Sequence, residues 1–429
     1  MNLLLTRACS NSCPYCFEKA ERQGGKPGFI TMDNVRLFAN WACNCRLEFL
    51  SLLGGEPFLH TQLAEIIRLL RQTCPGTGLR VLTGGVFNKH RLNDISPQDV
   101  AIGFNVNEPR DYENPKHFTK VLNNIETAIL KGFVVTLSFN VWRSDFDTTF
   151  IPRLAHRFAR SSFSWTVANP IRGQESSVVP TTQFHSLAGR CLAMLQESAK
   201  VGIGALLDCP LPLCFFKDAD LGWIRQNHPD TAAHMGVCQP TLDTTPELEV
   251  IRCFACSKLA RVKLTDFHNE REIREWFQEH QDYHLLQQGC FSNCNQCRHF
   301  IEGRCYGGCL ARHQGPLNLG GYSKIEELAE KMRASLEAGT PQGALSLYEA
   351  AGYWWKTEVP TLIAAIAASR LERWDLAFRF AAEANDKTRD PGFMRKVEEF
   401  LKSIPYGENR PSADLPANDT VTPFISCPE

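Results

Sequence analysis

The sequence has almost no net charge and lacks any long apolar segment. Its 46 Lys and Arg residues nearly balance its 47 Asp and Glu residues, which leaves a net charge of -1. Charge therefore gives no reason to expect nucleic acid or an acidic membrane as a partner. No segment reaches the ~18 consecutive apolar residues that a membrane-spanning helix needs, and the apolar residues 3–5 are too few for a signal peptide. We therefore expect a cytoplasmic protein that binds neither a membrane nor nucleic acid.

Cysteine, by contrast, is abundant, with 18 residues in a chain of 429. Many of these cysteines stand at C-x2-C and C-x3-C spacings. Because no secretion signal precedes them, these spacings indicate metal-bound thiolates rather than a disulfide framework. The length allows two or three domains with their own cores, and 43% apolar with 22% charged residues is ordinary for a globular protein.

Strand and helix patterns alternate along the first third of the chain. This alternation predicts a parallel sheet with helical crossovers, hence an α/β fold in which six βα units form a partial (β/α)6 barrel. The expected strands are residues 3–6, 47–53, 79–82, 100–106, 134–141 and 164–171, and the expected helices are residues 31–45, 63–70, 118–130 and 150–158.

The rest of the chain changes character twice. We assign residues 1–185 to the barrel and residues 186–318 to a second domain. Within it, residues 205–315 are rich in Cys, Pro and Gly, and we expect them to fold around metal because they cannot build an ordinary core. Residues 319–405 have a helical pattern with small residues on one stripe, which suits either a tetratricopeptide-like repeat or a plain helical cap. Residues 406–429, rich in Pro, Asn, Ser and Asp, are expected to be a flexible tail.

The most informative motif is the C-x3-C-x2-C run formed by Cys9, Cys13 and Cys16, directly after the first expected strand. Three thiolates can bind three irons of a [4Fe–4S] cluster and leave the fourth iron open to a substrate or cofactor. The alternative is a zinc site that lacks one ligand.

A second motif, Gly54-Gly55-Glu56-Pro57, follows the second expected strand. Two glycines allow a close approach of the backbone to a ligand, and the Glu56 carboxylate could accept a hydrogen bond from an ammonium group. Both motifs stand at the carboxyl ends of parallel strands, where ligands of such folds bind.

Together the two motifs resemble the radical S-adenosylmethionine (radical SAM) superfamily. The resemblance implies that Cys9, Cys13 and Cys16 are the catalytic cluster ligands and that the second motif holds the methionyl amine of SAM. Reductive cleavage of SAM would then give a 5′-deoxyadenosyl radical that abstracts hydrogen from a substrate. Further candidate SAM contacts stand at other strand ends, where each is equally a turn-capping residue: Thr83, Asn105, Asn107, Asn140 and Asn169.

The cysteines of the second domain resemble the SPASM/twitch extension of radical SAM enzymes, which holds auxiliary [4Fe–4S] clusters. The resemblance assigns Cys238, Cys253 and Cys309 to a nearer cluster, with Cys214 or Cys209 as its fourth ligand. It assigns Cys294, Cys297 and Cys305 to an outer cluster, with Cys290 as a substitute for a missing fourth ligand. Cys256 also falls in this region, at a C-x2-C spacing from Cys253. One cluster with spare thiols, or a structural zinc site, remains open as an alternative.

The resemblance favours an oxidoreductase that modifies a ribosomally made peptide or a protein, by crosslinking or oxidation. Because the barrel begins at residue 3, we expect either the helical region or a separate protein to recognise a leader peptide. The electron donor would be a flavodoxin or ferredoxin. The alternatives are a radical SAM dehydrogenase or tailoring enzyme for a small molecule derived from a sugar or amino acid, and a non-catalytic iron–sulfur adaptor.

Overall fold

The computed structural model describes residues 1–404, apart from residues 19–27, 172–177, 240, 283–284, 286–288, 314–322, 352–355 and 389. The tail expected at residues 406–429 lies outside the described residues. Contacts within the chain divide it into two compact units, Met1–Gly320 and Gly321–Glu429. None of the helices in the described part of the chain combines the length and the apolar character needed to cross a membrane.

The first unit is built on a sheet in which ten strands are described, in the order β10-β9-β8-β1-β2-β3-β4-β5-β6-β7. Neighbours from β8 through β7 are parallel, whereas β8, β9 and β10 pair antiparallel. The strands are β1 (Asn2–Thr6), β2 (Phe49–Gly54), β3 (Gly78–Thr83), β4 (Ala101–Asn105), β5 (Val135–Val141), β6 (Ser162–Val167), β7 (Gly204–Leu207), β8 (Asp243–Thr244), β9 (Glu249–Ile251) and β10 (Arg261–Lys263).

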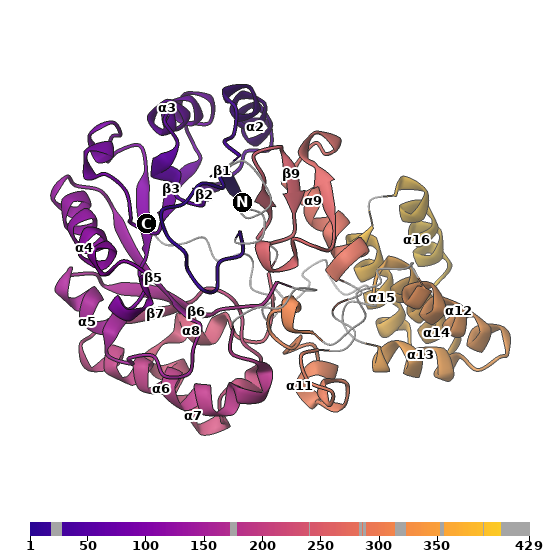
Figure 1. Cartoon of the computed structure of the whole chain (residues 1–429). Coiled ribbons are helices and arrows are strands. Elements are labelled where there is room, and N and C mark those ends of the chain that lie inside the picture. Colours follow the sequence, from indigo (N-terminus) through magenta and orange to yellow (C-terminus); the bar gives the residue numbers. More distant parts are fainter. Residues whose placement is uncertain are drawn as a thin grey trace. The chain divides into compact units, whose positions relative to one another are not determined.

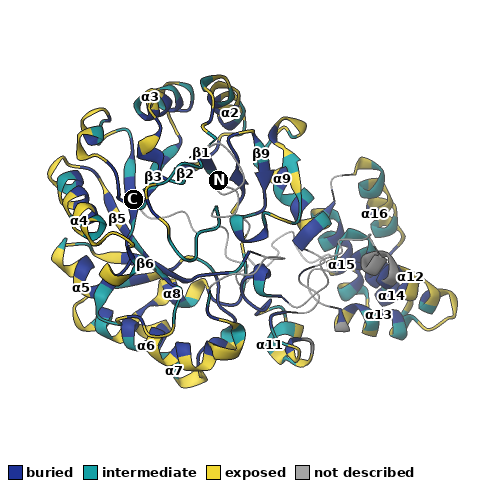
Figure 2. Ribbon diagram, viewed as in Figure 1, coloured by how far each residue is buried: buried dark blue, intermediate teal, exposed yellow. Residues whose placement is uncertain are grey.

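Helices cover the outer face of the curved sheet (Figure 1). In α3, the buried residues Leu63, Ile66, Ile67 and Leu70 follow the helical period and face the sheet. Figure 2 shows the same division, with buried residues on the strands and exposed residues on the outer helix faces. The helices of this unit are α2 (Met32–Asn44), α3 (Leu63–Thr73), α4 (Pro115–Leu130), α5 (Phe150–Arg157), α6 (Phe184–Lys200), α7 (Asp218–Asn227), α8 (Pro229–Ala233), α9 (Glu270–Phe277) and α11 (Arg298–Ile301).

The expected α/β class with a parallel sheet at its centre is confirmed. The sheet extends beyond the six expected strands, however, because β7 pairs with β6 at one edge and β8 pairs with β1 at the other. No break in the fold coincides with the boundary expected near residue 185, which falls at the start of α6.

The expectation that residues 205–315 cannot build an ordinary core is wrong for the first part of that region. Leu207, Phe215, Ile224, Ile273 and Phe277 all belong to the main core of the first unit. The physical reason is that the strands of this region have only two to four residues. Such short strands carry too few residues to show an alternating pattern in the sequence.

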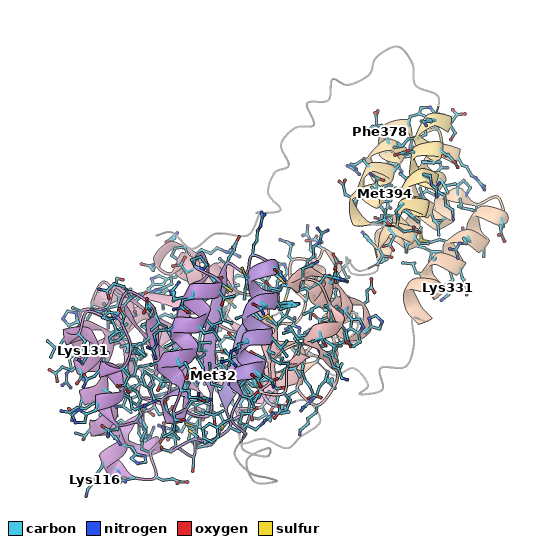
Figure 3. All side chains as sticks on the ribbon, turned by 90° about the horizontal axis from the view of Figure 1, so that it is seen from above. Met32, Lys116, Lys131, Lys331, Phe378 and Met394 are labelled. Atoms are coloured by element: carbon cyan, nitrogen blue, oxygen red, sulfur yellow. The ribbon has the colours of Figure 1, made fainter. Side chains whose placement is uncertain are left out.

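The second unit is helical, as expected from its pattern. Small buried residues such as Ala344, Ala364, Ala377 and Ala381 lie where successive helices pack closely. In Figure 3, Lys331 marks α12, Phe378 marks α15 and Met394 marks α16, while Met32, Lys116 and Lys131 mark outer helices of the first unit. The helices of the second unit are α12 (Ser323–Glu337), α13 (Pro341–Ala350), α14 (Glu358–Arg370), α15 (Trp374–Lys387) and α16 (Pro391–Ser403).

Candidate active site

The loop with the first three cysteines follows β1 at its carboxyl end. The backbone N–H of Asn11 donates a hydrogen bond to Sγ of Cys9 at 3.4 Å. The N–H of Cys16 donates to the carbonyl oxygen of Cys13 at 3.1 Å. The thiols of Cys9, Cys13 and Cys16 are all partly exposed. A short non-helical loop therefore presents three accessible sulfur atoms.

The two glycines of the second motif are required because the backbone at the end of β2 passes very close to the backbone of residues 6–8, where the cysteine loop begins. A Cβ atom on Gly54 would lie 2.2 Å from the carbonyl oxygen of Thr6, and one on Gly55 would lie 2.1 Å from that of Ala8. The N–H of Gly55 donates to the Thr6 carbonyl at 2.6 Å, and the N–H of Glu56 donates to the Ala8 carbonyl at 2.7 Å. The glycines thus join the cysteine loop to the end of β2, a role that the sequence did not suggest.

Glu56 is almost completely buried, with 1% of its surface exposed. Its carboxylate accepts the hydroxyl of Thr83 at 2.7 and 2.8 Å and the N–H of Phe58 at 3.2 Å. Burial raises the pKa of this carboxyl group to about 7, against the effect of these hydrogen bonds. Pro57 is also buried and begins the short turn Pro57–Leu59. Glu56 and Thr83, both predicted as cofactor contacts, therefore also tie the end of β2 to the end of β3.

Three of the predicted asparagines meet around Tyr15, which precedes the last cysteine of the loop. The hydroxyl of Tyr15 donates to Oδ1 of Asn107 and accepts from Nδ2 of Asn105 at 3.0 Å. Asn140 in turn donates to Asn105 at 3.0 Å, and Nδ2 of Asn107 lies 3.5 Å from Sγ of Cys13. The ends of β4 and β5 are thereby connected to the cysteine loop.

The cysteines of the following region form two sets. In the first, the neighbouring Cys256 thiol is the main reason that the pKa of Cys253 is lowered. Burial raises the pKa of Cys209 well above its ordinary value, and neighbouring thiols of the same set raise it further. The first thiol set comprises Cys209, Cys238, Cys253, Cys256 and Cys309.

The second set is organised in the same way. The Cys290 thiol lies close to Cys294 and lowers the pKa of Cys294. Gly289 allows this approach, because a Cβ atom there would lie 2.7 Å from Sγ of Cys294. The second thiol set comprises Cys214, Cys290, Cys294, Cys297 and Cys305.

The two sets distinguish Cys209 from Cys214, which the sequence offered as alternative fourth ligands of one cluster. Cys209 lies with the first set and Cys214 with the second, so the two candidates for one fourth ligand belong to different sets. Cys256 was given no role from the sequence, although its C-x2-C spacing from Cys253 was a signal for one. Among the described residues, no three or more His, Cys, Asp or Glu side chains are arranged to hold a single metal ion.

Comparison with known families identifies the N-terminal part of the chain. A model described as the radical SAM superfamily matches residues 3–142, which include both motifs and strands β1 to β5. The chain carries a radical SAM domain. The structure of anSMEcpe with bound AdoMet has the same fold, with a TM-score of 0.54 at 14% sequence identity over 80% of this chain and 99% of that one.

Curated relatives of the radical SAM domain include proteins named GTP 3′,8-cyclase. The protein from Tolumonas auensis is 22% identical over 254 residues, which are 56% of this chain and 70% of that protein. The protein from Yersinia pestis is 24% identical over 139 residues, which are 31% of this chain and 43% of that protein. For the Yersinia protein, the similarity thus spans less than half of its length.

A radical SAM domain implies SAM and one [4Fe–4S] cluster, and the residues of this chain fit that cluster. Cys9, Cys13 and Cys16 lie on one loop, and two of their sulfur atoms accept or closely approach N–H donors from Asn11 and Asn107. Hydrogen bonds of this kind favour the thiolate, which is the form that binds iron. We propose that these three thiolates hold the SAM-binding cluster.

Asn169, the last predicted contact, has a different environment from the other asparagines. It is 5% exposed, and its side-chain oxygen accepts Nε of Arg312 at 2.8 Å. Arg312 also donates to the carbonyl of Val179 at 2.9 Å and to that of Ala168, and its guanidinium lies over the ring of Phe184. Asn169 therefore joins the end of β6 to the cysteine-rich region rather than to the other asparagines.

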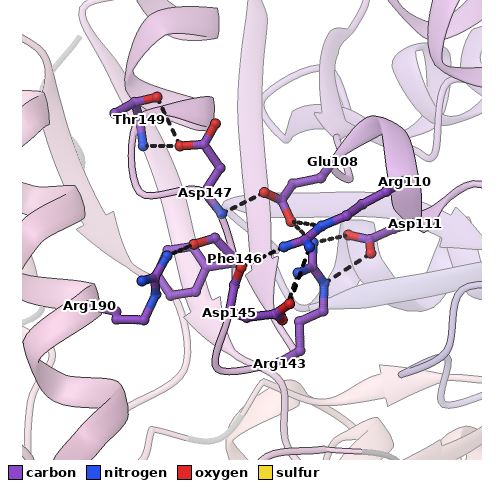
Figure 4. A network of polar contacts seen from close by, with 9 residues as sticks. All are labelled: Glu108, Arg110, Asp111, Arg143, Asp145, Phe146, Asp147, Thr149 and Arg190. Atoms are coloured by element: carbon purple, nitrogen blue, oxygen red, sulfur yellow. Dashed lines mark hydrogen bonds and ion pairs between the residues drawn. The ribbon is translucent and has the colours of Figure 1, made fainter.

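An ion-pair network fixes the loops beyond β4 and β5 in the radical SAM domain (Figure 4). The guanidinium of Arg143 contacts Glu108, Asp111 at 3.1 Å and Asp145 at 2.8 Å. Glu108 also accepts the N–H of Asp147 at 2.6 Å. Because Glu108 follows Asn107 directly, this network sets the position of the asparagine beside Cys13.

Two residues of the site were not assigned from the sequence. Tyr15 is the hydrogen-bonding centre that joins Asn105 and Asn107. Its position beside Cys16 was the one available signal. Nothing in the sequence indicated a role for Arg312, because its hydrogen-bond partners lie more than 130 residues earlier in the chain.

Proposed function

We propose that this radical SAM enzyme acts on a peptide or protein and that its two thiol sets hold auxiliary [4Fe–4S] clusters. When bound and reduced, the SAM-binding cluster supplies the electron that cleaves SAM and yields a radical. The chain's own residues would hold the cluster, orient SAM and exclude water. A flavodoxin or ferredoxin would supply the electron.

The observation that carries this proposal is the presence of two separate sets of five thiols after the radical SAM domain. In each set a neighbouring thiol lowers the pKa of one cysteine, Cys253 in the first and Cys294 in the second. Each set exceeds the four thiolates that one closed cluster requires. The arrangement resembles the SPASM/twitch extension, whose best-known members modify peptides. The helical second unit would contact the peptide, alone or with a separate leader-binding protein.

Similarity to GTP 3′,8-cyclases supports a second candidate function. The relative from Tolumonas auensis is similar over 56% of this chain, which is more than the radical SAM model covers. A nucleotide such as GTP is therefore the alternative substrate. It would occupy the same site, since the hydrogen is abstracted next to bound SAM in either case.

Anaerobic turnover distinguishes these two functions. Protein reconstituted with iron and sulfide is incubated with SAM and a reductant, and either with short peptides encoded beside the gene or with GTP. Mass spectrometry follows 5′-deoxyadenosine and the mass of each substrate. We expect deoxyadenosine together with a mass change in a peptide, and a loss of two hydrogens would indicate crosslinking or oxidation.

The Cys13→Ala protein is the control for this turnover experiment, because it lacks one cluster ligand. A change in GTP with no change in any peptide would overturn the peptide proposal in favour of the alternative. Iron-replete protein that releases no deoxyadenosine with any substrate would support the adaptor hypothesis.

SAM binding is expected to weaken as the pH falls through about 7. We propose that the Glu56 carboxylate lies close enough to the SAM amine to attract its positive charge. Below a pKa of about 7 the carboxyl group is protonated and neutral, so this attraction is lost. The dissociation constant should then rise by up to about tenfold per pH unit, as measured by equilibrium binding between pH 6 and 8.5.

Glu56→Gln is the matched variant, since it keeps the shape of the side chain and removes its titration. It should bind SAM more weakly at pH 8 and with a shallower pH dependence. Equal pH dependences in the two proteins would rule out Glu56 as the titrating group.

A further inference from the structure

Arg252 is a fully buried cation beside the first thiol set. It lies between the end of β9 and Cys253, and only 1% of its surface is exposed. A guanidinium cannot lose its proton in a protein, so its burial demands a compensating negative charge. The partners of the guanidinium therefore indicate the role of Arg252.

One edge of the guanidinium is neutralised by Asp282. Nε of Arg252 lies 3.0 Å from both carboxylate oxygens, and Nη2 lies 3.0 Å from Oδ2. Asp282 is 3% exposed and ends the π-helical turn Gln278–Asp282. The two hydrogen bonds from Nε and the ion pair of Nη2 hold this edge of the guanidinium against the carboxylate.

The opposite edge faces sulfur. Nη1 of Arg252 donates to Sγ of Cys238 at 3.2 Å. Cys238 belongs to the first thiol set, and the residue after Arg252 is Cys253 of the same set. The planar side chain of Arg252 thus connects the Asp282 carboxylate with the Cys238 thiol. Its backbone directly precedes Cys253, a second thiol of the set.

We propose that Arg252 and Asp282 are the positioning pair of the first auxiliary cluster, in which Arg252 donates to the Cys238 thiolate and raises the reduction potential of that cluster. The proposal rests on the proposed function, which assigns a [4Fe–4S] cluster to this set. N–H donors and positive charge beside the sulfur ligands stabilise the more negative, reduced state. Asp282 holds the guanidinium plane so that Nη1 points at sulfur.

Lysine cannot replace Arg252 in this arrangement. An ammonium group is a single point of charge without the rigid fork that binds a carboxylate on one edge and sulfur on the other. Arg252→Lys therefore keeps the charge and loses the geometry. This variant therefore tests whether Arg252 acts through the orientation of its hydrogen bonds or only through its positive charge.

The test uses the full-length protein reconstituted with iron and sulfide under anaerobic conditions. Two variants are compared with the wild type: Arg252→Lys, and the double variant Arg252→Met with Asp282→Leu. The double variant leaves no buried unpaired charge, so it can fold where a single neutral substitution would not. Arg261→Met is the control, because Arg261 lies on β10 of the same antiparallel region but is exposed and pairs with Glu249 at 3.1 Å.

The measurements are the iron content and the midpoint potential of each cluster signal in an electron paramagnetic resonance titration. We expect one auxiliary signal to move to a lower potential, most in the double variant and less in Arg252→Lys. The signal that responds to SAM should keep its potential in every variant, and Arg261→Met should shift none.

Two outcomes would overturn the inference: one also refutes the auxiliary clusters, and the other refutes only the role of the positioning pair. Wild-type protein with only about four irons per chain and a single, SAM-responsive signal would refute the auxiliary clusters and the positioning pair together. Wild-type protein with an auxiliary signal whose potential is the same in both Arg252 variants would leave the proposed function intact and give the pair a purely structural role.

Discussion

Replacing Cys13 with Ala is expected to abolish SAM cleavage. The loop Cys9–Cys16 offers three thiolates for three irons, so the loss of one leaves a further iron without a protein ligand. Cys13 also lies beside Nδ2 of Asn107, which connects the loop to the asparagine group. Production of 5′-deoxyadenosine should fall to the background without enzyme, while the iron held by the two thiol sets remains bound.

Cys43→Ala is the matched control for this substitution, because Cys43 is an exposed thiol on α2 that belongs to neither thiol set. It should cleave SAM at the wild-type rate. Wild-type cleavage by Cys13→Ala would refute the assignment of the SAM-binding cluster, whatever its effect on product formation.

Replacing Cys297 with Ala is expected to separate SAM cleavage from product formation. Cys297 belongs to the second thiol set, whereas the SAM-binding loop is held by its own contacts with the ends of β2 and β4. The variant should therefore still release deoxyadenosine, now uncoupled from substrate, and product should fall to a small fraction of the wild-type yield. Both products are measured in the same turnover experiment.

Cys45→Ala serves as the control here, since Cys45 is a partly exposed thiol at the end of α2 outside both sets. Iron content must be measured alongside turnover. If Cys297→Ala loses deoxyadenosine and product in parallel with normal iron at the SAM-binding site, the second set is not an independent auxiliary centre.

The elements of the radical SAM domain were predictable because its strands have five to seven residues and alternate with helices. Strands β1 to β6 lie at or near the expected residues. Strands β8 to β10 have only two or three residues each. Their existence depends on pairing with β1 and with one another, which no local pattern records.

The motifs of the site were predictable, but their connections were not. Spacing grouped Cys9, Cys13 and Cys16, and the residue types of the Gly-Gly-Glu-Pro motif, through their resemblance to radical SAM enzymes, singled out residues 54–57. Tyr15 and Asn107 are 92 positions apart, and Arg252 and Asp282 are 30 apart. Side-chain contacts at such separations depend on how the sheet brings strand ends together. They therefore leave no local pattern in a single sequence from which they could be predicted.

The pairing of β8 with β1 has a consequence for any attempt to isolate the radical SAM domain. A protein that ended at residue 185 would lose β8 from one side of the sheet and β7 from the other. Two rows of backbone N–H and C=O groups, on β1 and β6, would then be open to pairing with other molecules, which is the common origin of edge-to-edge aggregation. We therefore expect a radical SAM domain isolated for study to need β7 and β8 to cover both sides of its sheet.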